Sequence, residues 1–328
     1  MSTTLLFLVP IGMLAVLWSL CFVGCVLNRH GTLGPGPDPG NPPTYSDDFV
    51  LTESSLVAYW PLSDLLGSLD TQGQTSGAGD LSGNNHIGTY TIPPAYPSGV
   101  QAVSQSSPIS NPALTRKPSI IPGDAGSTKN PAPASVDFEG GYVSIPWSTQ
   151  TSPQLDQFTF EAWIKPTWTG SGFVWVVFSA FINNTGFRIL INDQNHWELV
   201  IGTGPGNMPN AIDTMVSIDP TSQTLTYVAA TCDMNGVFSL WINPMSDNNT
   251  PPANWTSGSS TNYVAADPSQ LTAIFIGAGA NDQPLRTPTM NPTGAPLYPF
   301  QGQIQSVALY SSVLAATDLQ SHFLAGAG

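Results

Sequence analysis

The sequence predicts an all-β fold in which two antiparallel sheets pack face to face as a sandwich. Glycine and proline each occur 31 times, while charged residues make up only 9% of the chain. This composition suits strands and turns and is poor in the Glu, Lys and Arg that fill exposed helix faces. Short apolar runs also alternate with Gly-, Pro- and Asn-rich turns, a spacing typical of antiparallel sandwiches.

The N-terminal segment is predicted to be one transmembrane helix that precedes the sandwich. Residues 5–27 carry no charge and are long enough to span about 30 Å of hydrocarbon. The residues before them lack the basic start of a cleaved signal, so we expect an uncleaved anchor over residues 1–30. A second interpretation stays open, because Phe22-Val23-Gly24-Cys25 resembles a lipobox, which would place a lipid on Cys25.

Residues 31–50 are predicted to be a Pro/Gly-rich linker that holds a domain over residues 51–328 away from the membrane. The flanking Arg29 favours a cytoplasmic side for that domain, because basic residues tend to stay inside. The acidic composition, with a net charge of −14, favours export instead. We therefore expect the domain to be extracytoplasmic, at a cell surface or in a periplasm.

The clearest predicted strands combine β-branched or aromatic residues with turn signals at their ends. They cover residues 57–60, 142–145, 158–164, 173–181, 187–191, 197–201, 225–232, 237–242, 273–276 and 304–310. Residues 316–323 carry apolar residues at helical spacing and predict one short closing helix. Residues 93–133 and 244–267 show no strand pattern, and we expect them to be long surface loops.

Several of these segments carry motifs that occur in a fixed order. The motifs are LVAYWPL (56–62), DLSGNN (80–85), VDFEGGYV (136–143), FTFEAWIKP (158–166), YVAATCD (227–233), GVFSLWIN (236–243) and FQGQIQSVALY (300–310). In this order, over about residues 56–325, the chain resembles the laminin-G-like domains of the concanavalin-A-like family. The resemblance implies a jelly-roll sandwich of two curved antiparallel sheets, in agreement with the composition and the strand pattern.

The DLSGNN turn has two interpretations. In the family it leads into an early strand, so its Gly and Asn residues would serve the backbone by adopting positive φ. The family also binds Ca²⁺ in many members, and Asp64, Asp80, Asn84 and Asn85 supply suitable oxygen donors. Gln305-Ser306 stands where the family usually carries Asp-Glu, which weakens the calcium interpretation.

No catalytic residue is predicted. A retaining glucanase needs two carboxylates about 5–5.5 Å apart, often supplied by E-x-D-x-x-E on one strand, and this motif is missing. The glutamates stand apart from one another: Glu53, Glu139, Glu161 and Glu198. Glu161 lies in a strand motif where we expect a structural role. His196-Trp197-Glu198 is a local group of interest, but adjacent strand residues face opposite sides. A glycosidase is therefore the third interpretation of function.

The sequence instead predicts a non-catalytic, lectin-like module that binds glycan or protein. Sugar recognition uses exposed aromatic faces beside amide or carboxylate side chains. Trp147, Trp168 and Trp255 fall in predicted turns or loops and are the candidate ligand-binding residues. The alternative for each is that the indole pins a long loop to the sandwich.

Charge and cysteine content exclude other classes. Seven basic against 21 acidic residues leave no basic cluster for phosphates, so we expect no nucleic-acid partner. The three cysteines are not placed for a disulfide framework, and no cofactor other than Ca²⁺ is suggested. The second interpretation of function is a structural or accessory subunit of a membrane, envelope or virion assembly.

Overall fold

The computed structural model describes residues 45–62, 77–91, 119–122, 134–139, 141–149, 152–167, 174–218, 225–244, 255–259, 262–279 and 298–327. Residues 44–328 form one compact unit. The predicted anchor at 5–27 lies outside the described residues, as do Asp64 and Trp168. Within the described ranges, no helix is long and apolar enough to cross a membrane.

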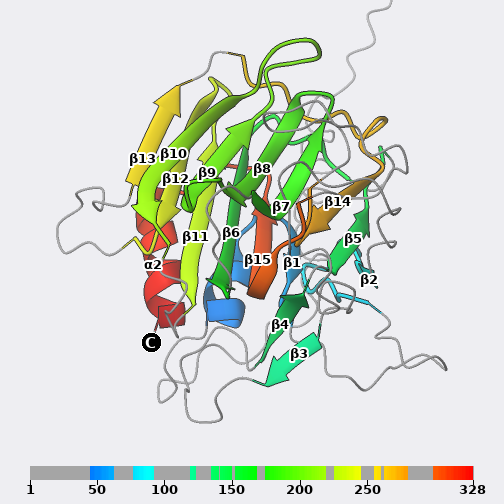
Figure 1. The fold of residues 1–328 in the computed structure, drawn as a ribbon. Coiled ribbons are helices and arrows are strands. Elements are labelled where there is room, and N and C mark those ends of the chain that lie inside the picture. The colour runs from blue at the N-terminus through cyan, green and yellow to red at the C-terminus, as the bar shows by residue number, and fades with distance from the viewer. Residues whose placement is uncertain are drawn as a thin grey trace, which may run out of the picture. The chain divides into compact units, whose positions relative to one another are not determined.

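Two antiparallel sheets make up the fold (Figure 1). The larger sheet has the order β13-β12-β11-β6-β15-β4-β3, and β1 also pairs with β15. Its strands are β1 (Leu56–Trp60), β3 (Ser119–Pro122), β4 (Ala134–Glu139), β6 (Phe158–Pro166), β11 (Thr226–Cys232), β12 (Val237–Ile242), β13 (Trp255–Ser259) and β15 (Gln301–Tyr310).

The smaller sheet has the order β10-β9-β8-β7-β14-β5-β2. Its strands are β2 (Thr89–Thr91), β5 (Tyr142–Pro146), β7 (Trp175–Ile182), β8 (Thr185–Ile191), β9 (His196–Ile201), β10 (Asn210–Ser217) and β14 (Ala273–Ile276). Only neighbouring strands exchange hydrogen bonds, so β10 and β2 are the outermost described strands of this sheet.

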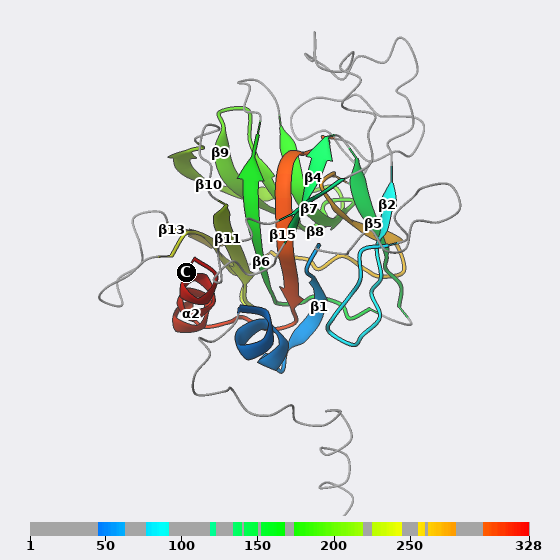
Figure 2. The ribbon, with the colours of Figure 1, turned by 90° about the horizontal axis from the view of Figure 1, so that it is seen from below.

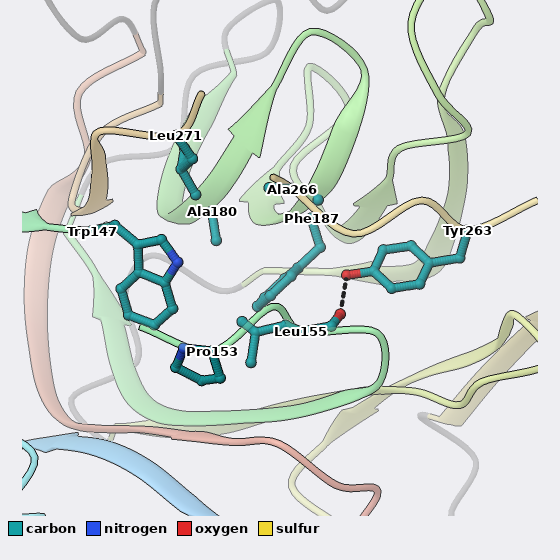
Figure 3. Close-up of a pocket in the computed structure, with 9 residues that line it drawn as sticks. Trp147, Pro153, Leu155, Ala180, Phe187, Tyr263, Ala266 and Leu271 are labelled. Carbon is teal, nitrogen blue, oxygen red and sulfur yellow. Dashed lines mark hydrogen bonds between the residues drawn. The ribbon is translucent and has the colours of Figure 1, made fainter. Parts of the chain in front are cut away.

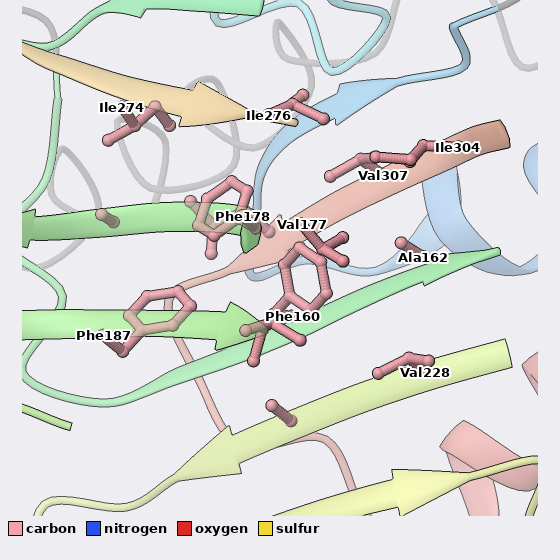
Figure 4. Packing of buried hydrophobic residues seen from close by; sticks show 14 of the residues in the cluster. Phe160, Ala162, Val177, Phe178, Phe187, Val228, Ile274, Ile276, Ile304 and Val307 are labelled. Atoms are coloured by element: carbon pink, nitrogen blue, oxygen red, sulfur yellow. The ribbon is translucent and has the colours of Figure 1, made fainter. Parts of the chain in front are cut away.

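The main core lies between the sheets and follows from period-two alternation. Along β8, Phe187, Ile189 and Ile191 join this core, whereas Leu190, between the last two, belongs to a separate cluster on the outer face. Phe158 of the larger sheet stacks on Phe187 with ring centroids 3.7 Å apart. Figure 4 shows Phe160 of β6 and Phe178 of β7 meeting in the same layer.

A second apolar cluster covers the outer face of the larger sheet. The helix α2 (Ala316–Ala327) packs there beside the one-turn helices η1 (Tyr45–Phe49) and η2 (Val50–Thr52), as Figure 2 shows. Phe323 of α2 stacks on Trp163 of β6 with ring centroids 5.8 Å apart. Both chain ends of the compact unit are therefore fixed to one sheet.

The predicted strands are all observed, with bounds shifted by three residues or fewer. Two expectations were wrong: β3 and β13 lie in segments that we predicted to be loops. β3 and β13 are the two outermost strands in the described order of the larger sheet, and each pairs with one neighbour only. An edge strand of this kind does not need a strong alternation of apolar residues. Residues 45–49 fall within the predicted linker, yet Tyr45 is 2% exposed and belongs to the second cluster.

Candidate functional site

Ionisable side chains converge on the outer face of the smaller sheet, at β9 and β10. His196 and Glu198 are two residues apart on β9 and share a face, while Trp197 between them joins the main core. Asp213 of β10 is paired with Glu198 in the sheet register. We call Asn192, His196, Glu198 and Asp213 the edge cluster.

Asn192, which follows β8, holds the edge cluster together. Its Nδ2 donates to Oε2 of Glu198 and to Oδ2 of Asp213, at 2.9 Å each. Its Oδ1 accepts the backbone N–H of His196 at 3.0 Å. Nδ1 of His196 lies 3.1 Å from Oδ2 of Asp213. The polar atoms are thus positioned by the fold.

The edge cluster presents an ionised carboxylate to solvent. Burial alone would raise the pKa of Asp213, but the Met215 N–H at 2.6 Å and the hydrogen bonds from His196 and Asn192 hold this pKa below its ordinary value. The Asp213 side chain is 25% exposed and that of His196 is 18% exposed, whereas Glu198 is 8% exposed. Asp213 and His196 are therefore the accessible members.

The DLSGNN turn has the backbone role that the sequence predicts. Oδ1 of Asp80 accepts the N–H groups of Tyr59 (3.0 Å) and Ser82 (2.9 Å), and Oδ2 accepts that of His86 (2.8 Å). Nδ2 of Asn84 donates to the Val57 carbonyl at 2.8 Å. Gly83 and Asn85 have φ values of 83° and 64°. The turn is fixed against β1.

Both oxygens of Asp80 are engaged in the described conformation, because Oδ1 accepts two backbone N–H groups and Oδ2 accepts one. Among the described residues, no group of three or more His, Cys, Asp or Glu side chains is arranged to hold a metal. Asp64 lies outside them. Calcium binding by Asp64, Asp80, Asn84 and Asn85 stays a prediction.

The candidate tryptophans have different positions. Trp147 is 3% exposed and stacks on His86 with ring centroids 5.0 Å apart. It also lines a small, mainly apolar cavity, partly open to solvent, together with Leu155 and Tyr263 (Figure 3). The volume open to a water-sized sphere is about 10 Å³, which is about enough for one water molecule and too little for a sugar ring. Trp255 begins β13, and its side chain is not among those described. Ligand binding by Trp147, Trp168 and Trp255 stays a prediction.

Among the described residues, Glu161 lies at the centre of a second group of ionisable side chains, and this group has no access to solvent through Glu161. It is fully buried beneath α2, where it accepts hydrogen bonds from the Tyr227 and Tyr310 hydroxyls. Nδ1 of His322 lies 3.1 Å from each carboxylate oxygen. These contacts support the predicted structural role of Glu161.

Sequence reasoning noted His196 and Glu198 but set them aside as candidates, and it missed Asn192 and Asp213. Asn192 lies in the polar stretch Asn192-Asp193-Gln194-Asn195 between two strands, which predicts only a turn. Asp213 meets the others through the β9–β10 register. If residues 196–217 had been predicted to form a β-hairpin, its pairing would have placed Asp213 opposite Glu198.

Residues 137–320 match the family model described as the concanavalin A-like lectin/glucanases superfamily. The chain belongs to this family. The matched range is more than half of the chain and contains the whole edge cluster, and it confirms the resemblance seen in the motifs.

Solved structures show similar but distant folds. One is the binding domain of botulinum neurotoxin DC in complex with SialylT, with 11% identity, a TM-score of 0.47, and coverage of 83% of this chain and 51% of that chain. Another is the binding domain of Paraclostridial Mosquitocidal Protein 1, with 13% identity, a TM-score of 0.49, and coverage of 82% and 52%. The chain thus spans about half the length of these toxin domains.

A third similar structure is domain 4 of AbnA, a GH43 extracellular arabinanase from Geobacillus stearothermophilus, in complex with arabinotriose. Its identity is 17% and its TM-score 0.47, with coverage of 82% of this chain and 98% of that chain. No curated protein sequence matches the chain.

Proposed function

We propose that the chain is a non-catalytic binding module that recognises carbohydrate through the edge cluster. The observation that carries the proposal is the ionised, partly exposed Asp213 carboxylate, fixed beside the His196 imidazole. Carboxylates accept short, charge-assisted hydrogen bonds from hydroxyl donors, and sugars offer such donors in neighbouring pairs. Membership of a family that includes lectins supports this class of ligand.

The hydrogen-bond directions favour binding over catalysis. A glycosidase needs one protonated carboxyl as general acid. Asp213 accepts from the Met215 N–H and from Asn192, and Glu198 also accepts from Asn192. Both groups are therefore arranged as acceptors, which suits recognition of hydroxyl groups.

Glycoside hydrolysis is the second candidate, and one observation favours it. Glu198 and Asp213 accept from the same nitrogen at 2.9 Å each, so those two oxygens lie less than about 6 Å apart. Retaining glycosidases hold their carboxyl groups about 5–5.5 Å apart. In this case the less exposed Glu198 would be the acid.

Display at a membrane surface forms part of the proposal. The uncharged segment 5–27 supports an anchor, and the Pro/Gly-rich residues 31–43, which precede the compact unit, support a spacer. The ligand could then be a glycan on an opposing surface. A role as a structural or accessory subunit is the alternative, and stoichiometric co-purification with other membrane proteins would favour it.

A glycan array tests the proposal. We expect the full chain to bind a restricted set of glycans, Asp213→Asn and His196→Gln to lose that signal, and the exposed control Asp156→Asn to keep it. An array that stays blank, or one on which Asp213→Asn binds like the wild type, contradicts the assigned site. Hydrolysis of a bound glycan that Glu198→Gln abolishes would select the glycosidase.

A further inference from the structure

We propose that the loops at one end of the sandwich form a second interaction surface, which takes a basic segment of another protein with interspersed apolar side chains. We call this surface the loop end. It comprises five segments of the described chain: 152–157, 183–184, 202–209, 233–236 and 262–270. The proposal concerns a different surface from the edge cluster and does not depend on carbohydrate binding.

Antiparallel pairing brings these loops to one end, at the top in Figure 1. The Val264 N–H donates to the Gly202 carbonyl at 3.0 Å, which joins segment 262–270 to segment 202–209. Tyr263 meets the ring of Phe158 at 5.8 Å, and Phe158 pairs with Cys232 just before segment 233–236. Segment 262–270 therefore lies between the other two loops.

Two methionines stand out on the loop end. Met208 is 87% exposed and Met234 is 76% exposed. Their backbones are fixed, because the Thr203 hydroxyl donates to the Met208 carbonyl at 2.7 Å and Asp233 caps the turn around Met234. Val264, between them, is 39% exposed. Flexible thioether side chains on a rigid backbone suit contact with varied apolar surfaces.

The charged side chains described around these methionines are all acidic. Asp156, Asp233 and Asp267 lie in the same loops, and the described residues of the loop end include no Lys or Arg. A backbone hydrogen bond from Ser269 holds the pKa of Asp267 below its ordinary value, so this carboxylate stays ionised. A complementary partner must carry basic groups near its apolar anchors.

The same charge disfavours other occupants. A second copy of the chain would bring a second set of aspartates and a net charge of −14 against the first. Anionic lipid and nucleic acid would be repelled for the same reason. A cationic, partly apolar polypeptide would complement both the aspartates and the exposed methionines of the loop end.

The test uses fluorescence anisotropy at physiological salt, with the full chain and a synthetic amphipathic leucine–lysine peptide as the probe. We expect saturable binding that weakens about tenfold or more in the double variant Met208→Gln/Met234→Gln, since about 1.4 kcal/mol corresponds to tenfold. The control Leu324→Gln changes an exposed apolar residue on α2 and should bind like the wild type. A peptide with glutamate in place of lysine should not bind.

Thermal melting checks that all variants are folded. Equal binding by the wild type and the double variant overturns the proposal, as does absence of binding or equal binding of the glutamate peptide. Concentration-dependent self-association that the double variant abolishes would assign the surface to a second copy instead. Asp213→Asn should leave peptide binding unchanged, which separates this result from the carbohydrate proposal.

Discussion

Nδ1 of His322 on α2 lies 3.1 Å from the carboxylate of Glu161 on β6, although 161 positions separate the two residues in the chain. Nε2 of the same imidazole lies 3.6 Å from Glu53, which follows η2. The rings of Tyr45 and Phe49 also pack against it. The C-terminal helix and the N-terminal segment thus meet the larger sheet at one buried charged pair.

Glu161→Gln should destabilise the fold, because it removes the buried carboxylate 3.1 Å from His322 and leaves only the partly exposed Glu53 as an opposite charge. We expect a loss of about 3–5 kcal/mol in the free energy of unfolding, measured by denaturant titration. Glu53→Gln is the matched control, since Glu53 is 28% exposed and its effect should stay below about 1 kcal/mol. Equal losses in the two variants would contradict this account of the pair.

The same pair predicts how stability depends on pH at the alkaline side. Burial would lower the pKa of His322, but Glu161, with smaller effects of Glu53 and Asp318, raises this pKa above its ordinary value. The raised pKa contributes stability that is complete below about pH 6.5 and is lost as the pH rises through the folded-state value. His322→Gln should remove this alkaline loss in melting curves; an unchanged pH profile would refute it.

Glu161 gives the opposite dependence at the acid side. Burial would raise its pKa, but His322 and the hydrogen bonds from His322, Tyr227 and Tyr310 lower it overall. Its stabilising contribution is therefore present above the unfolded-state value of about 4.3 and is lost as the pH falls through the lower folded-state value. The Glu161→Gln variant should not show this loss of stability as the pH falls, which can be measured by following its unfolding during acid titration.

Gly326→Ala should loosen α2, although alanine is the better helix former. A Cβ at this position would lie 2.3 Å from Cζ2 of Trp163, far inside van der Waals contact. We expect a loss of about 1–3 kcal/mol from the forced shift. Leu324→Ala changes the exposed face of the same helix and should stay within about 0.5 kcal/mol of the wild type. A stabilised Gly326→Ala protein would show that the helix does not pack this closely.

Asp80→Ala should destabilise the turn before β2, because three backbone N–H groups lose their acceptor. The expected loss is about 2–3 kcal/mol, against about 0.5 kcal/mol or less for the exposed control Asp156→Ala. Calorimetry with calcium and with chelator separates the two interpretations of this turn. A loss seen only in calcium would make Asp80 a ligand.

Much of the fold could be predicted from local pattern. Strands β6, β8 and β12 direct alternate apolar residues into the main core, although most of their outward-facing residues are buried as well. The turn at Gly83 and Asn85 shows a backbone requirement for positive φ. Strands β3 and β13 carry no such signal in their sequences, and it is their pairing with β4 and β12 that identifies them as strands.

The candidate site could be predicted only in part. His196 and Glu198 share a strand, so their common face follows from period two. Asp213 reaches them through the register of the β9–β10 pair, which depends on the length and shape of the intervening loop. The burial of Glu161 could not be predicted locally either, because α2, which covers it, lies far away in the chain.

Isothermal titration of a glycan found on the array, into the wild-type chain and the Asp213→Asn variant, tests the central claim most directly. We expect the wild type to bind and Asp213→Asn to bind at least about tenfold more weakly, with Asp156→Asn unchanged. Equal affinity of wild type and Asp213→Asn for the glycan would contradict the claim that the edge cluster is the binding site.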